Sequence, residues 1–235
     1  MPTRNRGQHP NDSKLFGGRW PAVLSEAADD FCFLLGRQYA EASTLQLVGN
    51  RYRLNKRQRH ALQRACCSPQ QTQSRTAKAC QANQLRNKTV EIDGFNLLIL
   101  LESALSGAYL FASRDGCYRD ISSVHGSYKR VIQTQEALVL IGKHLQQLEV
   151  AFAKWYLDQP VSNSGRLKTL LREVAAAHQF NWSVELVYNP DQQLAKSENI
   201  VISTDGWILD ECRRWFNLGR HIIEQDIPDA VVVSI

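Results

Sequence analysis

The chain has 235 residues, of which 43% are hydrophobic and 22% are charged, and this composition excludes wholesale disorder. Its formal net charge of +5 is unevenly divided. Residues 1–90 carry fifteen basic and five acidic side chains, whereas residues 91–235 carry thirteen basic and eighteen acidic ones. A basic segment before an acidic body favours a polyanionic partner, and no apolar run approaches the roughly 20 residues of a membrane-spanning helix.

Residues 1–20 are predicted to form a flexible tail, because they are polar and rich in Arg, Asn, Gly and Pro. They lack the apolar stretch of a secretory signal, so we expect a cytoplasmic protein. The six cysteines have neither a C-x-x-C pair nor the spacing of a zinc site, which is typical of free thiols in that compartment.

Residues 21–88 are predicted to form a small basic helical region. Apolar spacing indicates a helix from Ser25 to Tyr39, and Asn55 is expected to cap a second helix. Residues 70–87 suggest a linker or a loosely packed helix. Six cations lie within fourteen residues of this region, namely Arg51, Arg53, Lys56, Arg57, Arg59 and Arg64. They are expected to contact a phosphate backbone, although a solvated helix face or an arm docked onto the acidic body would need the same charges.

From residue 89 onward, short apolar strands alternate with amphipathic helices. The predicted strands are Thr89–Ile92, Ala108–Ala112, Val150–Leu157, Ser183–Tyr188, Ile200–Thr204 and Ala230–Ser234. The predicted helices are Asn96–Ser106, Thr134–Leu148, Gly165–His178 and Gly206–Ile223. This alternation predicts an α/β domain over residues 89–235, with a mostly parallel central sheet covered on both faces.

Acidic residues follow three of these strands. Asp93, Asp158 and Asp205 each come at a strand end, Glu102 lies in the helix after the first strand, and Asp210 follows Asp205. Each acid alone is also explained by a turn, a helix cap or a surface ion pair. Acids gathered at one sheet edge repel one another unless a cation lies among them, so the set predicts a Mg²⁺ or Mn²⁺ site.

Other polar residues near the predicted edge could contact a phosphate group. Asn96 follows the first strand, and Ser162 and Ser164 precede a helix whose free N–H groups suit an anion, although they would equally serve as ordinary caps. Arg114 and Arg119 could hold phosphate oxygens, or could pair with neighbouring aspartates and stiffen a loop. His125 is interpreted as a loop histidine, because no nucleophile or orienting acid accompanies it.

The blocks Ile92–Asn96 and Ile202–Asp210 resemble the strand-end motifs of PIN-like and NYN-type nuclease domains. Over residues 24–223 the chain resembles a prokaryotic family catalogued as domain of unknown function 434. The matching blocks are Val48–Tyr52, Asp93–Asn96, Arg114–Asp120, Leu157–Gly165 and Arg214–Leu218. The resemblance implies a PIN-like three-layer fold, with Asp93 as first metal ligand, Glu102, Asp158 and Asp205 as further catalytic acids, and Asp210 assisting.

We therefore expect a metal-dependent nuclease that hydrolyses phosphodiester bonds, with RNA favoured over DNA by the resemblance. Two alternatives stay open: a non-catalytic nucleic-acid-binding module of the same fold, and an enzyme acting on a small phosphorylated metabolite. No membrane partner is expected, and a homodimer is compatible with the sequence but nothing in it argues for one.

Overall fold

A parallel sheet forms the centre of the larger part of the molecule. The computed structural model describes residues 5–122 and 126–235, so residues 1–4 of the predicted tail and His125 lie outside the described residues. The sheet has the strand order β5-β4-β1-β6, and all of its pairings are parallel. Its strands are β1 (Thr89–Asp93), β4 (Phe152–Asp158), β5 (Trp182–Val187) and β6 (Ile200–Ile202).

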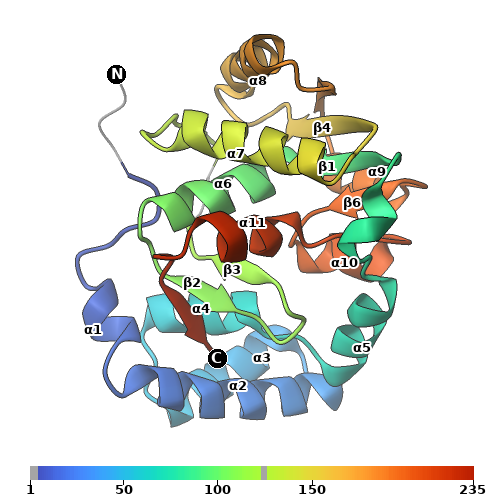
Figure 1. Ribbon diagram of the computed structural model, residues 1–235. Coiled ribbons are helices and arrows are strands. Elements are labelled where there is room, and N and C mark those ends of the chain that lie inside the picture. Colours follow the sequence, from blue (N-terminus) through green and yellow to red (C-terminus); the bar gives the residue numbers. More distant parts are fainter. Residues whose placement is uncertain (1–4, 123–125) are drawn as a thin grey trace.

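Helices cover both faces of this sheet, as the apolar strands predict (Figure 1). Side chains alternate along β4, so Trp155 enters one apolar core and Tyr156 enters the other. The first core is shared with α6 (Gly94–Leu105), α7 (Thr134–Gln147), α8 (Ser164–His178) and α11 (Leu218–Asp226). The second core is shared with α9 (Pro190–Ala195) and α10 (Gly206–Glu211).

A second, three-stranded sheet lies between this part and the N-terminal helices (Figure 1). Its order is β3-β2-β7, with β2 (Leu110–Ala112) antiparallel to β3 (Tyr118–Asp120) and parallel to β7 (Val232–Ser234). Two segments predicted as strands, Ala108–Ala112 and Ala230–Ser234, thus belong to a separate sheet. Strand periodicity shows where a strand lies but not which sheet it joins.

The N-terminal helices share an apolar core with the small sheet. They are α1 (Asp12–Phe16), α2 (Trp20–Gly36), α3 (Glu41–Arg51) and α4 (Lys56–Ala65). Phe16 is buried against Phe111 of β2, with ring centroids 4.8 Å apart, so this part of the predicted tail is ordered. Asn55 caps α4 as predicted, accepting hydrogen bonds from the Arg57 and Gln58 N–H groups.

Residues 70–87, predicted as a linker or a loosely packed helix, contain most of α5 (Pro69–Lys78), followed by a short 3-10 turn at Ala82–Leu85. Ser68 caps α5 through a reciprocal pair of hydrogen bonds with Gln71. Figure 1 shows α5 running from the N-terminal helices towards α10. This helix therefore connects the basic region to the larger sheet.

The predicted helix Gly206–Ile223 is wrong, because the chain breaks it into α10 and α11. The break carries an extended stretch beside β6, where the Val201 N–H donates to the Arg214 carbonyl and the Phe216 N–H donates to the Val201 carbonyl. Backbone pairing with a neighbouring strand outweighs local helical periodicity here. None of the helices in the described part of the chain combines the length and apolar character needed to cross a bilayer.

Candidate functional site

Three aspartates follow three adjacent strands of the larger sheet. Asp93 ends β1, Asp158 ends β4, and Asp205 follows β6, and the order β4-β1-β6 puts β1 in the middle. Asp93 pairs in register with Tyr156, so Asp158 lies two residues, roughly 7 Å, beyond the level of Asp93. The structure thus brings the three predicted acids to one sheet edge but staggers them along the strand direction.

Asp93 is the most buried of the three, with 8% of its surface exposed. The Ser203 hydroxyl donates to Asp93 Oδ2 at 2.8 Å, and the Asn96 N–H donates to Oδ1 at 3.4 Å. Burial is the main cause that raises the pKa of Asp93 to about 7, and the Ser203 hydrogen bond partly opposes it. The negative charges of Asp191 and Asp205 raise this pKa further. The carboxylate is therefore held in an environment that would favour a nearby cation.

Asp158 and Asp191 line a hollow of about 290 Å³ together with Asp93 and Asn96. Burial raises the pKa of Asp158, and its Oδ1 atom is buried with no hydrogen-bond partner among the described residues. Burial, followed by the negative charges of Asp205 and Asp158, raises the pKa of Asp191. An unpartnered carboxylate oxygen among like charges is the most unusual polar feature of this edge.

Asp191 was missed by the sequence analysis, although a signal for it exists. The predicted strand Ser183–Tyr188 is followed directly by Asn189, Pro190 and Asp191, so a fourth strand delivers an acid to the same edge. Applying the strand-end rule to every strand would have found it.

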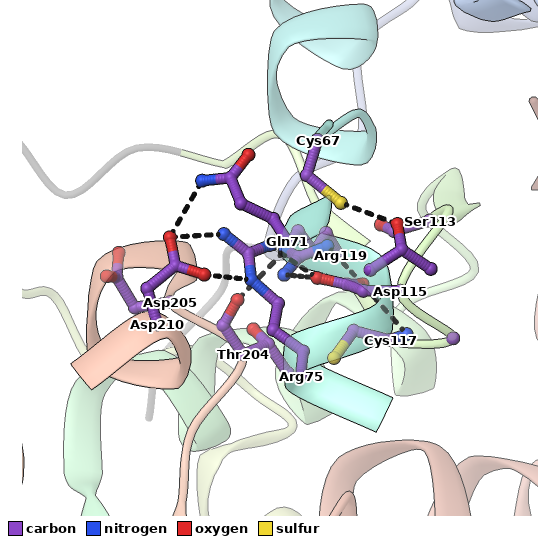
Figure 2. A network of polar contacts seen from close by, with 12 residues as sticks. Cys67, Gln71, Arg75, Ser113, Asp115, Cys117, Arg119, Thr204, Asp205 and Asp210 are labelled. Carbon is purple, nitrogen blue, oxygen red and sulfur yellow. Dashed lines mark hydrogen bonds and ion pairs between the residues drawn. The ribbon is translucent and has the colours of Figure 1, made fainter. Parts of the chain in front are cut away.

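Asp205 is held by its own backbone and by α10. Its Oδ1 caps α10 by accepting from the Trp207 and Ile208 N–H groups, and its N–H donates to the Ser203 hydroxyl oxygen at 3.0 Å. The carbonyl of the preceding Thr204 accepts from Arg119 Nε at 2.8 Å (Figure 2). Asn96 Oδ1 accepts from both the N–H and the hydroxyl of Thr204, at 2.9 Å each. Asn96 thereby ties the start of α6 to the segment that carries Asp205.

The donor set at this edge suits a hard divalent cation. In the described part of the chain, no three His, Cys, Asp or Glu side chains stand together as a ready-made group that could hold a metal ion. Mg²⁺, however, is usually bound by only one or two carboxylates and keeps several waters. Asp93 and Asp158 line one hollow and supply two carboxylates, one of them with an unpartnered Oδ1 atom. Asp191 and Asp205 add negative potential at Asp93.

Glu102, the predicted catalytic acid of the helix after β1, does not lie at this edge. It follows Asp93 by nine residues, roughly 13 Å along α6. Its buried carboxylate accepts from Arg6 Nε at 2.8 Å, from the Tyr128 hydroxyl at 2.5 Å and from the Thr134 hydroxyl at 2.6 Å. Glu102 thus ties the N-terminal segment to the start of α7 and is fully occupied there.

Asp210, predicted as an assisting metal ligand, is also occupied elsewhere (Figure 2). Its carboxylate accepts from Arg75 Nε at 2.7 Å and Nη2 at 2.8 Å, and from the Gln71 amide at 2.8 Å. Arg75 Nη1 also donates to Asp115, which Arg119 contacts through both Nη groups. Burial alone would raise the pKa of Asp115, but Arg119 and Arg75 outweigh it and hold that pKa well below its usual value.

The predicted phosphate ligands of the loops are mostly engaged within the protein. Arg119 is buried in the network just described, and Arg114 contacts Asp29 at 2.8 Å and the Ser25 carbonyl at 3.2 Å. The Ser164 hydroxyl donates to the Gln159 carbonyl, whereas the backbone of Ser162 pairs with that of residues 126 and 128. For Arg119, pairing with a neighbouring aspartate is the interpretation that the structure supports.

The six basic residues of the N-terminal region fall into two groups. Arg57 pairs with Asp12 at 2.6 Å, Arg59 donates to the Leu54 carbonyl and to Asn50, and Arg64 donates to the Asp120 carbonyl at 3.3 Å. Arg51, Arg53 and Lys56 have exposed side chains, and Arg51 makes a partly exposed ion pair with Asp30. Four of the six predicted nucleic-acid contacts thus make contacts within the protein, and the Arg51 contact is the most exposed of these.

Comparisons with known proteins divide the chain near residue 80. Residues 82–221 match the family described as Domain of unknown function (DUF5616), and residues 23–78 match Protein of unknown function (DUF434). The chain is 32% identical over 186 residues to Uncharacterized protein MJ0935 from Methanocaldococcus jannaschii, covering 79% of this chain and 88% of that protein. No solved structure matches the chain significantly. The predicted resemblance to domain 434 is confirmed for residues 23–78, and the chain as a whole belongs to the family described as Domain of unknown function (DUF5616).

Proposed function

We propose that this protein is a metal-dependent nuclease with a PIN-like body that hydrolyses phosphodiester bonds, RNA being favoured. One observation carries the proposal: Asp93, Asp158 and Asp191 line a single hollow in which a buried carboxylate oxygen of Asp158 has no hydrogen-bond partner among the described residues. Asp93 is buried, whereas Asp158 is partly exposed and Asp191 is exposed. A buried carboxylate beside a second acid with an orphaned oxygen is destabilising in isolation, and a bound divalent cation would offset that cost.

The proposed chemistry assigns a task to each group at the edge. A bound Mg²⁺ or Mn²⁺ would supply an activated water and would stabilise the charge that develops on the phosphate. Asp93 and Asp158 would hold the ion, and Ser203 would orient Asp93 through its 2.8 Å hydrogen bond. Asn96 would keep the Asp205 segment in place, and Asp191 and Asp205 would add negative potential that favours the ion.

The test is a cleavage assay with the full chain, on fluorescent single- and double-stranded RNA and DNA, with Mg²⁺ or Mn²⁺ and with a chelator. We expect metal-dependent cleavage that Asp93→Asn and Asp158→Asn abolish. Asp229→Asn, an exposed aspartate far from the site in the sequence, is the matched control and is expected to cleave normally. Cleavage that is absent from the wild type under all conditions, or equal in all variants, would contradict the proposal.

One observation favours the second candidate, a non-catalytic nucleic-acid-binding module: no ready-made three-ligand group exists in the described residues. That module would bind nucleic acid equally well with Asp93→Asn and without metal. The third candidate, an enzyme on a small phosphorylated metabolite, relied on residues 162–165 and on the block around Arg114. It loses support because Arg114 and Arg119 are paired internally.

A further inference from the structure

A second hollow is lined in part by Asp205, and it shares no lining residue with the acid-lined hollow of Asp93, Asp158 and Asp191. It has a volume of about 610 Å³, and we name it the inter-segment hollow. One wall comes from residues 35–75 and includes Tyr39, Arg64 and Gln71, while the other comes from α10 and includes Trp207 and Asp210. Each of the two matched segments therefore supplies one wall, and the volume lies in the range of small-molecule binding sites.

Arg75, Arg119 and Asp210 form the floor of the inter-segment hollow and belong to one network with the buried Asp115 (Figure 2). Arg75 bridges Asp115 and Asp210, and Arg119 pairs with Asp115, so two buried cations balance two acids. Each of these contacts is between 2.7 and 2.8 Å. Such a floor gives the hollow a fixed shape and a polar surface.

Two aromatic rings are exposed on this hollow. Trp207 has 49% of its surface exposed and Tyr39 has 59%, and they come from different walls. A large aromatic ring normally buries most of its surface, so two such rings on one polar hollow point to a flat ligand. Trp207 lies only two residues after Asp205, next to the edge where a phosphodiester would be cut.

A cation with free donors lines the same hollow. Arg64 donates through Nε to the Asp120 carbonyl, and its Nη groups have no hydrogen-bond partner among residues 5–122 and 126–235. A guanidinium group with two free donors can hold a phosphate in bidentate fashion. Flat rings and a guanidinium group with unused Nη donors together match the chemistry of one nucleotide.

We propose that the inter-segment hollow binds one unpaired nucleotide of a single-stranded nucleic acid, with its base against Trp207 and a phosphate at Arg64. The choice of a polynucleotide rests on the proposed function, because a strand cut beside Asp205 must pass this hollow. A paired base is stacked inside its duplex and offers no free face to an aromatic ring, so single strands are selected.

The test is a binding titration of the full chain carrying Asp93→Asn, so that the probe survives. The probe is a fluorescent single-stranded RNA of about 12 nucleotides at fixed salt, followed by anisotropy. Adding Trp207→Ala should weaken the affinity by roughly 5- to 150-fold, the worth of one base–aromatic stack, and Trp207→Phe should retain most of it. An abasic site at one position of the probe should reproduce the loss while leaving the protein untouched.

Phe33→Ala is the matched control, because Phe33 is an exposed aromatic outside this hollow, and it should bind like the parent. A duplex of the same sequence should bind equally to the parent and to Trp207→Ala. Equal single-strand affinity of Trp207→Ala and Phe33→Ala, in proteins with unchanged thermal melting, would overturn the inference. If binding depends on Trp207 but the wild type shows no metal-dependent cleavage, only the proposed nuclease activity is contradicted. If the wild type cleaves but binding does not depend on Trp207, only the proposed nucleotide site is contradicted.

Discussion

Asp93 shows at the level of one residue how the burial of a carboxylate lowers stability. It is buried, and its burial is only partly offset by the Ser203 hydroxyl and the Asn96 N–H. An aspartate with a pKa of about 7 in the folded chain has a pKa of about 4 in the unfolded chain. The folded state therefore binds the extra proton, and stability falls as pH rises from about 4 to about 7.

The decrease of stability with rising pH gives a first prediction. Without metal at about pH 8, Asp93→Asn should be more stable than the wild type, by up to roughly 4 kcal/mol, because the charged form is lost from a buried site. The difference should shrink as the pH falls from about 7 to about 4 and should level off below about 4, where the wild-type carboxyl is protonated in both states. Thermal unfolding of both proteins over this pH range checks it. Asp229→Asn should follow the wild type, and a wild type more stable than Asp93→Asn at high pH would contradict the sign.

Elements, rather than residues, decide which acids meet at the candidate site. The strand-end rule correctly brought Asp93, Asp158 and Asp205 to one edge, because parallel strands end on the same side of a sheet. The rule does not predict where Glu102 and Asp210 lie, because both are inside helices and their hydrogen-bond partners come from distant segments of the chain. Arg6 precedes Glu102 by 96 positions and Arg75 precedes Asp210 by 135. Such long-range pairings leave no local pattern in the sequence.

Long-range contacts also explain which parts of the fold could not be predicted from the sequence. Periodicity located the strands of the larger sheet, and the Asn55 cap located α4. Helix α5, a Gln-rich segment with few large apolar residues, is held largely by Ser68 capping and by the contacts of Arg75. The break before α11 comes from Trp215, whose indole N–H donates to the Arg75 carbonyl and whose backbone joins the edge of β6. Tertiary contacts of this kind override local propensity.

Helix α5 therefore gives a prediction at the scale of the element. Arg75→Met should lower the free energy of unfolding by about 3 to 5 kcal/mol, because it leaves the buried Asp115 and the Asp210 side chain with fewer partners. Arg75→Lys should rescue little, since one ammonium group cannot make three directed contacts to two carboxylates. Chemical denaturation followed by circular dichroism measures both.

The matched control is Arg213→Met, which removes an exposed ion pair with Glu198 and should change stability by less than about 1 kcal/mol. Equal effects of Arg75→Met and Arg213→Met would mean that the buried network contributes little to stability.

For the whole molecule, the uneven charge of the chain has a structural meaning as well as a functional one. Arg6, Arg64 and Arg75 of the basic segment contact Glu102, Asp120, Asp115 and Asp210 of the acidic one. Part of the positive excess is thus used to join the two segments. The exposed side chains of Arg51, Arg53 and Lys56 stay as candidates for the phosphate backbone.

The contacts between the basic and the acidic segment predict how each segment behaves when it is produced alone. Residues 79–235 produced alone should fail to unfold cooperatively, because Phe111, Ile121 and Val233 lose the helices that cover them and Asp115 loses Arg75. Co-production of residues 1–78 as a second chain should restore a cooperative thermal transition. A cooperative melt of the isolated 79–235 fragment, measured by circular dichroism, would show that the two segments are independent domains.

Strand β7 has a consequence for the order of events during synthesis. Val233 and Ile235 are buried in the core that α1, α2 and α4 share with the small sheet. The N-terminal helices therefore wait for residues that are translated roughly 170 positions later, and their apolar faces stay uncovered while the intervening residues are made. At about 5 to 20 residues per second that wait is on the order of ten seconds or more, so nascent chains of this protein are expected to need chaperone protection until Ile235 has left the ribosome.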